Sequence, residues 1–303
     1  MQAASIARFL DPAGIGRILV VVNDIDEAEC VRQVEALRPE YGPFASRVEV
    51  VRPDALFDAR PASNAPRGLR QRFRLWFARR RWRYPFGVKS GWRGNRGWSV
   101  QQALKLAVAR HGDSRFILIL DAKNSFVRPV GRASFVSAQG RPLTYTEVPT
   151  DKFRGWIVGS FRLLGLTPPE RDVPAPPTIT PVCLTRSVLL GALDTLERRV
   201  GPAEAFFARA RSQESEFMLV YAYVEGHCGG WDATFDPGLK PPASIFRADD
   251  SKIVDAVLTR VENGEADVFS IHSARVASLT PEERGRISDI WRSRGLPAHL
   301  VFP

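Results

Sequence analysis

Two short apolar runs, each followed immediately by a polar loop, constrain the fold of this chain more than any other feature. They are RILVVV (17–22) and RFILIL (115–120), each with a single arginine at its start. Apolar runs of this length favour strands that are buried on both faces, which are typical of sheets covered by helices on both sides. We therefore predict that both runs are central strands.

The segments around these runs alternate between helical spacing and short strand patterns, and no repeat is visible. Such alternation predicts an α/β fold with an open, mainly parallel sheet and helices on both faces. A chain of 303 residues can form it as one domain, 1–303. We predict a Pro-rich loop at 167–181, further strands at 46–52, 181–185 and 266–272, and helices at 26–38, 97–112, 151–164, 187–199, 203–211, 214–225, 251–262 and 280–294.

The motifs of several large enzyme classes are missing. No glycine-rich dinucleotide fingerprint, P-loop, GxSxG nucleophile turn or HExxH metal motif is present. No segment approaches the roughly 18 apolar residues of a membrane-spanning helix. The stretch before Asp11 lacks the apolar core of a secretory signal. We therefore expect a cytoplasmic protein.

The net charge of +10 is concentrated in one segment. Residues 67–96 hold ten arginines and one lysine without a single acidic residue, so this segment carries +11 and the rest of the chain −1. Aromatic residues alternate with these arginines. We therefore predict a basic, aromatic insertion at 67–96.

Three interpretations of this insertion remain open. An anionic membrane surface would attract the arginines and accept the aromatic rings at headgroup level. Nucleic acid would use the same residues for phosphate contacts and base stacking. A plain surface helix would pack its aromatics on the core and solvate its arginines. We favour the membrane, or a glycolipid in it, over nucleic acid, and expect the contacts to come from Arg74, Trp76, Arg80 and Trp82.

Polar residues follow three of the predicted strands where each strand ends. Asn23 and Asp24 follow the first run, Asp121 follows the second, and His272 ends the strand at 266–272. In open α/β sheets, ligands bind outside the carboxyl ends of the strands. These residues are therefore predicted to share one site.

The segment around Asp121 resembles a known family. The helix GWSVQQALKLA (97–107), the apolar strand and LDAKNSFVRP (120–129) are similar to GT-A glycosyltransferases, most closely to bacterial enzymes that build capsule or lipopolysaccharide sugars. The resemblance is strongest over 97–130. It is weaker at the opening strand, at SEF (215–217) and at SIH (270–272). It implies a GT-A-like, Rossmann-type fold.

The resemblance also implies how the donor is held. In that class an Asp-x-Asp motif holds a divalent cation against the diphosphate of the nucleotide-sugar. Here Lys123 stands at the second acidic position. A fixed ammonium can stabilise a diphosphate leaving group as a metal does. Either Lys123 replaces the metal, or Asp121 and His272 hold Mn²⁺ or Mg²⁺; both remain open.

The other candidate residues complete this hypothesis. Gln101 and Lys105, which share a helix face, and Asn124 are expected to contact the donor, as are Asn23, Asp24 and His272. Glu216 matches a late acidic position of the family and is our candidate base for the acceptor hydroxyl, with Asp121 and Lys123 as its catalytic partners.

We therefore predict a glycosyltransferase that moves a sugar from a nucleotide-sugar to a carbohydrate or glycolipid acceptor in bacterial surface polysaccharide synthesis. It would work in the cytoplasm, or as a peripheral protein on the inner face of the inner membrane. One alternative is a sugar nucleotidyltransferase, although the loop after the first strand, NDIDEAE (23–29), is acidic rather than glycine-rich and basic. The other is a non-catalytic membrane-surface or nucleic-acid binding protein acting through 67–96.

Overall fold

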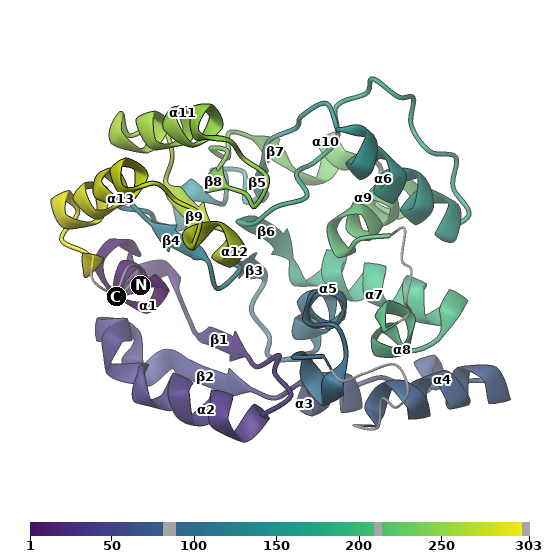
Figure 1. Cartoon of the computed structure of the whole chain (residues 1–303). Coiled ribbons are helices and arrows are strands. Elements are labelled where there is room, and N and C mark those ends of the chain that lie inside the picture. Colours follow the sequence, from purple (N-terminus) through teal and green to yellow (C-terminus); the bar gives the residue numbers. More distant parts are fainter. Residues whose placement is uncertain (81–88, 209–213, 299–303) are drawn as a thin grey trace.

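The computed structural model describes residues 1–80, 89–208 and 214–298, and it has a mixed α/β fold. Helices predominate, and the strands pair in sheets of two or three. Figure 1 shows the helices gathered in groups around these small sheets. The coarse prediction of an α/β fold is thus confirmed.

Four strands form a central layer, in two hydrogen-bonded pairs. The parallel pair is β1 (Ile18–Val21) with β2 (Val48–Val51), and the antiparallel pair is β3 (Phe116–Ile119) with β6 (Val182–Thr185).

Alternate residues of these strands face two different hydrophobic cores. Ile18 of β1 and Leu118 of β3 pack against a core that contains Phe44, whereas Leu19 and Ile117 pack against a second core, the one that contains Leu189. Successive side chains of a strand point to opposite faces. The two pairs therefore lie side by side as one layer between two cores, although β1 and β3 belong to separate hydrogen-bonded pairs.

The remaining strands differ from the predicted arrangement of one open, mainly parallel sheet. β9 lies between an antiparallel and a parallel neighbour, so this sheet is mixed. Apolar runs show that a strand is buried but not which strand it pairs with, which is why the sequence missed this division. The strands are β4 (Asn124–Phe126), β8 (Ala243–Ile245) and β9 (Val268–Ile271) in one sheet, and β5 (Leu143–Thr144) with β7 (Asp236–Pro237) in another.

The helices fall into groups according to the core that they cover. One group packs on the face of the central layer that includes Leu189: α3 (Pro53–Asp58), α5 (Gly97–Ala107), α6 (Asp151–Leu163), α7 (Arg186–Val200), α8 (Ala203–Phe207), α9 (Glu216–His227) and α10 (Trp231–Thr234). A second group packs on β8 and β9: α11 (Ser251–Glu262) and α13 (Pro281–Ser293), with α12 (Ser273–Val276) following β9.

The other helical elements connect these groups. α1 (Gln2–Phe9) packs on β4, and α2 (Glu27–Ala36) packs on β2, while α4 (Leu69–Arg79) packs on α8 at the edge of the molecule (Figure 1). Short 3₁₀ turns are η1 (Pro12–Gly14), η2 (Arg38–Arg47), η3 (Ala62–Asn64), η4 (Trp92–Gly94), η5 (Val108–Arg110) and η6 (Arg132–Ser134). Among the described residues, no helix is long and apolar enough to cross a membrane.

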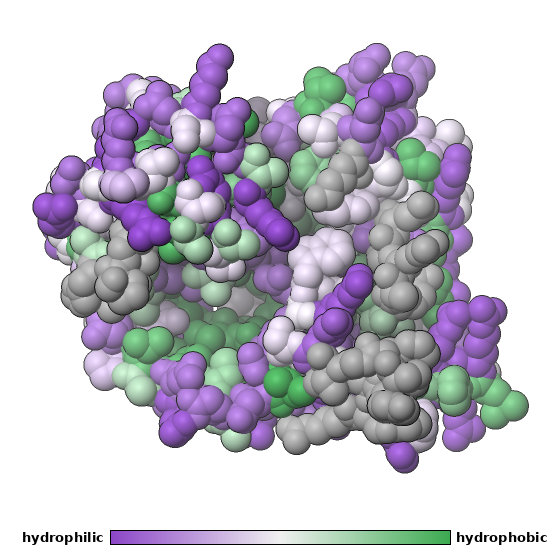
Figure 2. Space-filling model, viewed as in Figure 1, coloured by the Kyte–Doolittle hydropathy of each residue, from purple (hydrophilic) through white to green (hydrophobic). Residues whose placement is uncertain are grey.

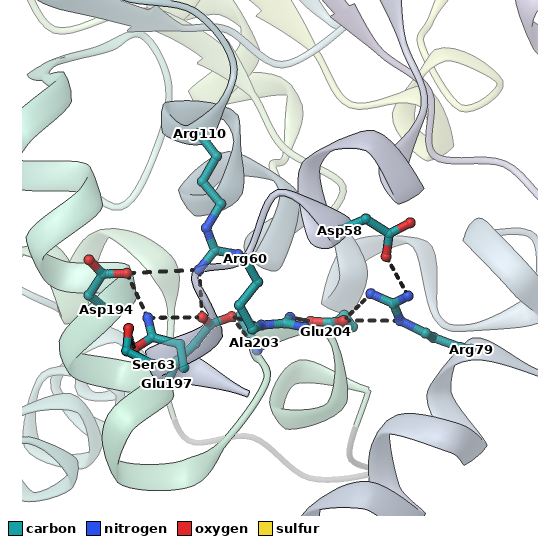
Figure 3. Close-up of polar contacts among 10 residues, drawn as sticks. Asp58, Arg60, Ser63, Arg79, Arg110, Asp194, Glu197, Ala203 and Glu204 are labelled. Carbon is teal, nitrogen blue, oxygen red and sulfur yellow. Dashed lines mark hydrogen bonds and ion pairs between the residues drawn. The ribbon is translucent and has the colours of Figure 1, made fainter. Parts of the chain in front are cut away.

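Two fully buried carboxylates join several of these elements (Figure 3). The side chains of Glu197 on α7 and Glu204 on α8 are both 0% exposed. Arg60 is paired with both of them, and its Nε lies 3.0 Å from Glu197. Arg110 pairs with Glu197, and Arg79 on α4 lies 3.0 Å from Glu204. The network therefore ties α4, α7, α8 and η5 together through charge.

We expect the Glu197→Ala substitution to lower the free energy of unfolding by about 3–5 kcal/mol, because it removes the buried counter-charge of Arg110 and one of the two buried counter-charges of Arg60. Urea unfolding followed by far-UV circular dichroism measures this. The matched control is Glu262→Ala, which removes an exposed partner of Arg286 and should cost less than about 1 kcal/mol. Equal losses in the two variants would contradict a structural role for the buried network.

Candidate active site

A large cleft opens where the two helix groups meet. Its volume is about 760 Å³, and Figure 2 shows the surface hollowed next to α12. The walls come from α5, α6 and the start of α9 on one side and from β9, α12 and α13 on the other. The polar lining residues include Gln101, Lys105, Asp121, Lys123, Ser125, Thr178, Ser215, Glu216, Ser270, His272 and Ser273. Six of the predicted site residues thus share one cleft.

Asp121 reaches this cleft because of its place after β3. It continues the odd-numbered face of that strand, which is the face covered by α5. On α5, Gln101 Nε2 donates to Asp121 Oδ1 at 3.0 Å, and Lys105 Nζ lies 2.8 Å from the same oxygen. Lys123 Nζ lies 3.7 Å from the other oxygen, Oδ2. Three side chains therefore hold this carboxylate in place.

Lys105 links Asp121 to a second carboxylate. Its Nζ lies 3.1 Å from Glu216 Oε1, and Glu216 opens α9, more than a hundred positions further along the chain. The side chains of Lys105 and Glu216 are 13% and 8% exposed. A single ammonium therefore bridges two largely buried carboxylates at the wall of the cleft.

The charges of this cluster support one another. Burial by itself would raise the pKa of Asp121, but the Lys105 ammonium outweighs it, with help from Lys123 and Thr180, and the pKa lies below its ordinary value. Burial would lower the pKa of Lys105, but Glu216 and Asp121 together raise it. Asp121 and Lys105 are therefore both charged at neutral pH.

Asn124 shapes the turn between β3 and β4 rather than facing a ligand. It is 2% exposed. Its Oδ1 accepts hydrogen bonds from the Asp121 backbone N–H at 2.6 Å and from Thr180 Oγ1 at 2.7 Å. Asn124 was predicted to contact the nucleotide-sugar donor. In the structure its side chain has a positioning role, because it holds the backbone of Asp121.

The predicted metal pair fits a divalent cation poorly. His272 lies in the cleft, but its Nδ1 accepts from the Ala274 backbone N–H at 3.1 Å and so caps α12. The Asp121 carboxylate is engaged by an ammonium and an amide. In the described part of the chain, no group of three or more His, Cys, Asp or Glu side chains is arranged to hold a metal.

Asn23 and Asp24 are not among the residues that line the cleft. Asn23 donates to the Gly97 carbonyl at 2.7 Å and accepts from the Trp92 backbone N–H at 3.1 Å, so it connects β1 to the start of α5. Asp24 Oδ1 accepts from the Asp26 backbone N–H at 2.9 Å, a local turn. The structure thus gives both residues backbone partners outside the cleft.

An aromatic wall of the cleft was missed by the sequence analysis. Trp98 on α5 lies against Trp156 on α6, with ring centroids 5.7 Å apart, and Phe153 lies 5.1 Å from Trp156. Phe246 lines the cleft beside Lys123, whose Nζ is 5.7 Å from the ring centre. Trp98 could have been found, because it precedes Gln101 by three positions on the same helix face. The other rings come from distant elements and carry no such signal.

Two buried donors at the cleft are without a partner among the described residues. They are Thr178 Oγ1, in the Pro-rich loop, and Trp291 Nε1, on α13. Buried polar groups are nearly always hydrogen-bonded in folded proteins. Both therefore suit a cleft that receives a polar ligand.

Three of the four residues predicted to contact membrane or acceptor can be located, and they are not among the residues that line the cleft. Arg74 and Trp76 are on α4, and Arg80 follows it, with its guanidinium 4.1 Å from the centre of the Trp76 ring. Trp82 lies outside the described residues.

Comparison with known proteins places the chain in one family. Residues 2–254 match a family of unknown function (DUF6492), and because this covers most of the chain, the chain belongs to that family. The match contains Lys105, Asp121 and Glu216 and ends within α11, before His272. No curated protein matches the chain.

The lowered pKa of Asp121 gives a prediction for stability. A depressed carboxyl pKa contributes stability above its ordinary value of 3.8, and this contribution is lost as the pH falls through the folded-state pKa. We expect the difference in unfolding free energy between wild type and Asp121→Asn to shrink as the pH is lowered from neutral through 3.8 and below. Urea unfolding across this range measures it; a constant difference would contradict the ion pair.

Proposed function

We propose that the protein is a glycosyltransferase that takes its sugar from a nucleotide-sugar and passes it to a carbohydrate or glycolipid acceptor. The observation that carries this proposal is the Asp121–Lys105–Glu216 cluster at the wall of a cleft of about 760 Å³. The resemblance of 97–130 to GT-A enzymes is independent support. A GT-A-like arrangement is likewise proposed, since Asp121 follows a strand of the central layer.

The cleft contains the groups that glycosyl transfer requires. The departing diphosphate develops negative charge, and Lys123, which is 29% exposed beside Asp121, is placed to stabilise it. Asp121 would orient Lys123 and Gln101 toward the donor. Trp98, 51% exposed in the cleft, offers an aromatic face to a sugar ring or a base.

Glu216 remains our candidate for the base that accepts the acceptor proton. It is 6% exposed at the start of α9, and Ser215 beside it also lines the cleft. General base catalysis needs a carboxylate within hydrogen-bonding reach of the hydroxyl. Lys105 would hold Glu216 in position, so we assign Lys105 a positioning role instead of the donor contact first expected.

We further propose that the reaction does not depend on a divalent metal. Lys105 provides a fixed positive charge between Asp121 and Glu216, where two facing carboxylates would otherwise repel each other. This extends the alternative in which a lysine replaces the metal. The bridging ammonium, however, is that of Lys105, at 2.8 and 3.1 Å, rather than that of Lys123, at 3.7 Å.

The donor site can be tested with the nucleotides UDP, GDP, CMP and CDP, each with and without Mn²⁺. We expect one nucleotide to raise the melting temperature of the wild type, and the matching nucleotide-sugar to be consumed. Asp121→Asn should reduce that turnover at least about 100-fold, because the groups that stabilise the leaving diphosphate lose their orientation.

The matched control is Asp113→Asn, the same change in the loop that precedes β3, where the side chain is 95% exposed. It should turn over like the wild type. If no nucleotide shifts the melting temperature, or if Asp121→Asn keeps full turnover, the glycosyltransferase proposal fails. Consumption of a sugar phosphate and a nucleoside triphosphate instead would identify a nucleotidyltransferase.

The role of Lys105 gives a separate prediction. Lys105→Ala leaves the carboxylates of Asp121 and Glu216 facing each other without their ammonium, and hard divalent cations favour such oxygen ligands. We expect this variant to acquire Mn²⁺ binding, measured by isothermal titration calorimetry. Lys123→Ala, which removes the more distant ammonium, should not. Equally tight Mn²⁺ binding by the wild type would contradict the proposal of metal independence.

A further inference from the structure

Helix α4 is turned so that three of its large apolar side chains face away from the protein. Leu69 is 85% exposed, Phe73 is 65% exposed and Trp76 is 41% exposed. These positions are spaced by four and three residues and therefore lie on one helix face. The rings of Phe73 and Trp76 are stacked, with centroids 5.8 Å apart. We refer to these three residues as the outer stripe of α4.

The inner face of α4 is mostly polar. Arg79 pairs with Asp58 at 2.6 Å and with the buried Glu204. Gln71 lies against Gly201 and accepts from the Arg67 backbone N–H. Ala78 is the buried residue on this helix. For Phe73 and Trp76 this differs from the interpretation in which the aromatics of the segment pack on the core, because charge pairs help to anchor α4 while the outer stripe meets the solvent.

Exposure of this stripe to water is unfavourable, and its neighbours indicate what covers it. Arg70 and Arg72 are exposed on either side of the stripe, and the Arg80 guanidinium lies over the Trp76 ring at 4.1 Å. An apolar stripe with flanking arginines and interfacial aromatics complements an anionic lipid surface. Nucleic acid would use the arginines, but a continuous stripe of leucine, phenylalanine and tryptophan along one helix face matches the apolar boundary of a membrane better. Figure 2 shows apolar side chains projecting beside hydrophilic ones at the edge of the molecule that α4 forms.

We propose that α4 docks on an anionic membrane surface, lying in the plane of the headgroups with Leu69, Phe73 and Trp76 inserted. The helix has 11 residues and is thus too short to span a bilayer. The docking is peripheral. The arginines pair with lipid phosphates, and the side chains of the outer stripe move from water into the boundary between the headgroups and the acyl chains. The proposal stands on the geometry of α4 and does not require the glycosyltransferase activity.

The docked helix is connected to the cleft through the loop before α5. Arg93 Nη1 donates to the Arg79 carbonyl at 2.9 Å, and Asn95 Nδ2 donates to the Ala78 carbonyl at 2.9 Å. This loop leads directly into α5, which carries Trp98, Gln101 and Lys105. A membrane held by α4 would therefore sit at a defined position relative to the cleft, which suits an acceptor held in that membrane.

The test is co-sedimentation of the full chain with vesicles of phosphatidylglycerol and phosphatidylcholine in about equal parts, and with phosphatidylcholine alone. We expect binding to the anionic vesicles that weakens as salt is added. Arg70→Ala with Arg72→Ala should lower the partition coefficient about 30-fold, since each arginine near such a surface contributes about five-fold. The triple change Leu69→Ser, Phe73→Ser, Trp76→Ser should lower it at least about 100-fold.

The control changes three exposed apolar residues elsewhere, Leu37→Ser, Val148→Ser and Ile253→Ser, and should bind like the wild type. Because the three residues of the outer stripe are exposed, the α4 variants should retain the wild-type circular dichroism spectrum and melting temperature. Equal binding by the α4 triple variant and the control would overturn the proposal. So would binding to a single-stranded oligonucleotide, measured by fluorescence anisotropy, without binding to vesicles.

Discussion

The buried pair of carboxylates, Glu197 and Glu204, is the constraint on which the packing of α4, α7 and α8 beside the cleft helix α5 depends. Each is fully enclosed, so each must be neutralised, and the neutralising arginines come from other elements: Arg60 before η3, Arg79 on α4 and Arg110 on η5. A buried charge without its partner is strongly destabilising. The network therefore leaves these helices little freedom to shift, and η5 continues directly from α5, the helix that carries Lys105.

The cluster at the cleft uses the same chemistry in a different setting. Glu197 and Glu204 are closed off from solvent, whereas Asp121 is 18% exposed and lies at the wall of a large cleft. Charged groups that solvent cannot reach serve the structure alone. A cluster of carboxylates and ammoniums that is open to a cleft can also contact a ligand. Two carboxylates can lie at the open cleft because Lys105 neutralises Asp121 and Glu216 together, which leaves Lys123 to face the cleft.

Local sequence patterns predicted the parts of the site that are close along the chain. The apolar run before Asp121 placed this residue at the end of a strand, and the spacing of Gln101 and Lys105 placed them on one helix face, as the structure has them. The contact between Lys105 and Glu216 could not be foreseen, because it depends on how α5 packs against α9. The same limit applies to strand pairing and to Trp156. Asn124 illustrates a further limit: the side chain of a polar residue beside a site can be engaged within the protein, here by the Asp121 backbone and by Thr180.

Helix α4 shows why composition alone left three interpretations open. Its arginines and aromatics suit a membrane, nucleic acid or a solvated surface helix, and the orientation of the helix is what separates these interpretations. That orientation is set from outside the helix, by Asp58 and the buried Glu204, which draw Arg79 inward. Because Arg79 is held by these ion pairs and the buried Ala78 faces the protein, the stripe of Leu69, Phe73 and Trp76 on the far side of the helix from Ala78 faces outward. The interior charge network thus determines which surface the protein presents to its surroundings.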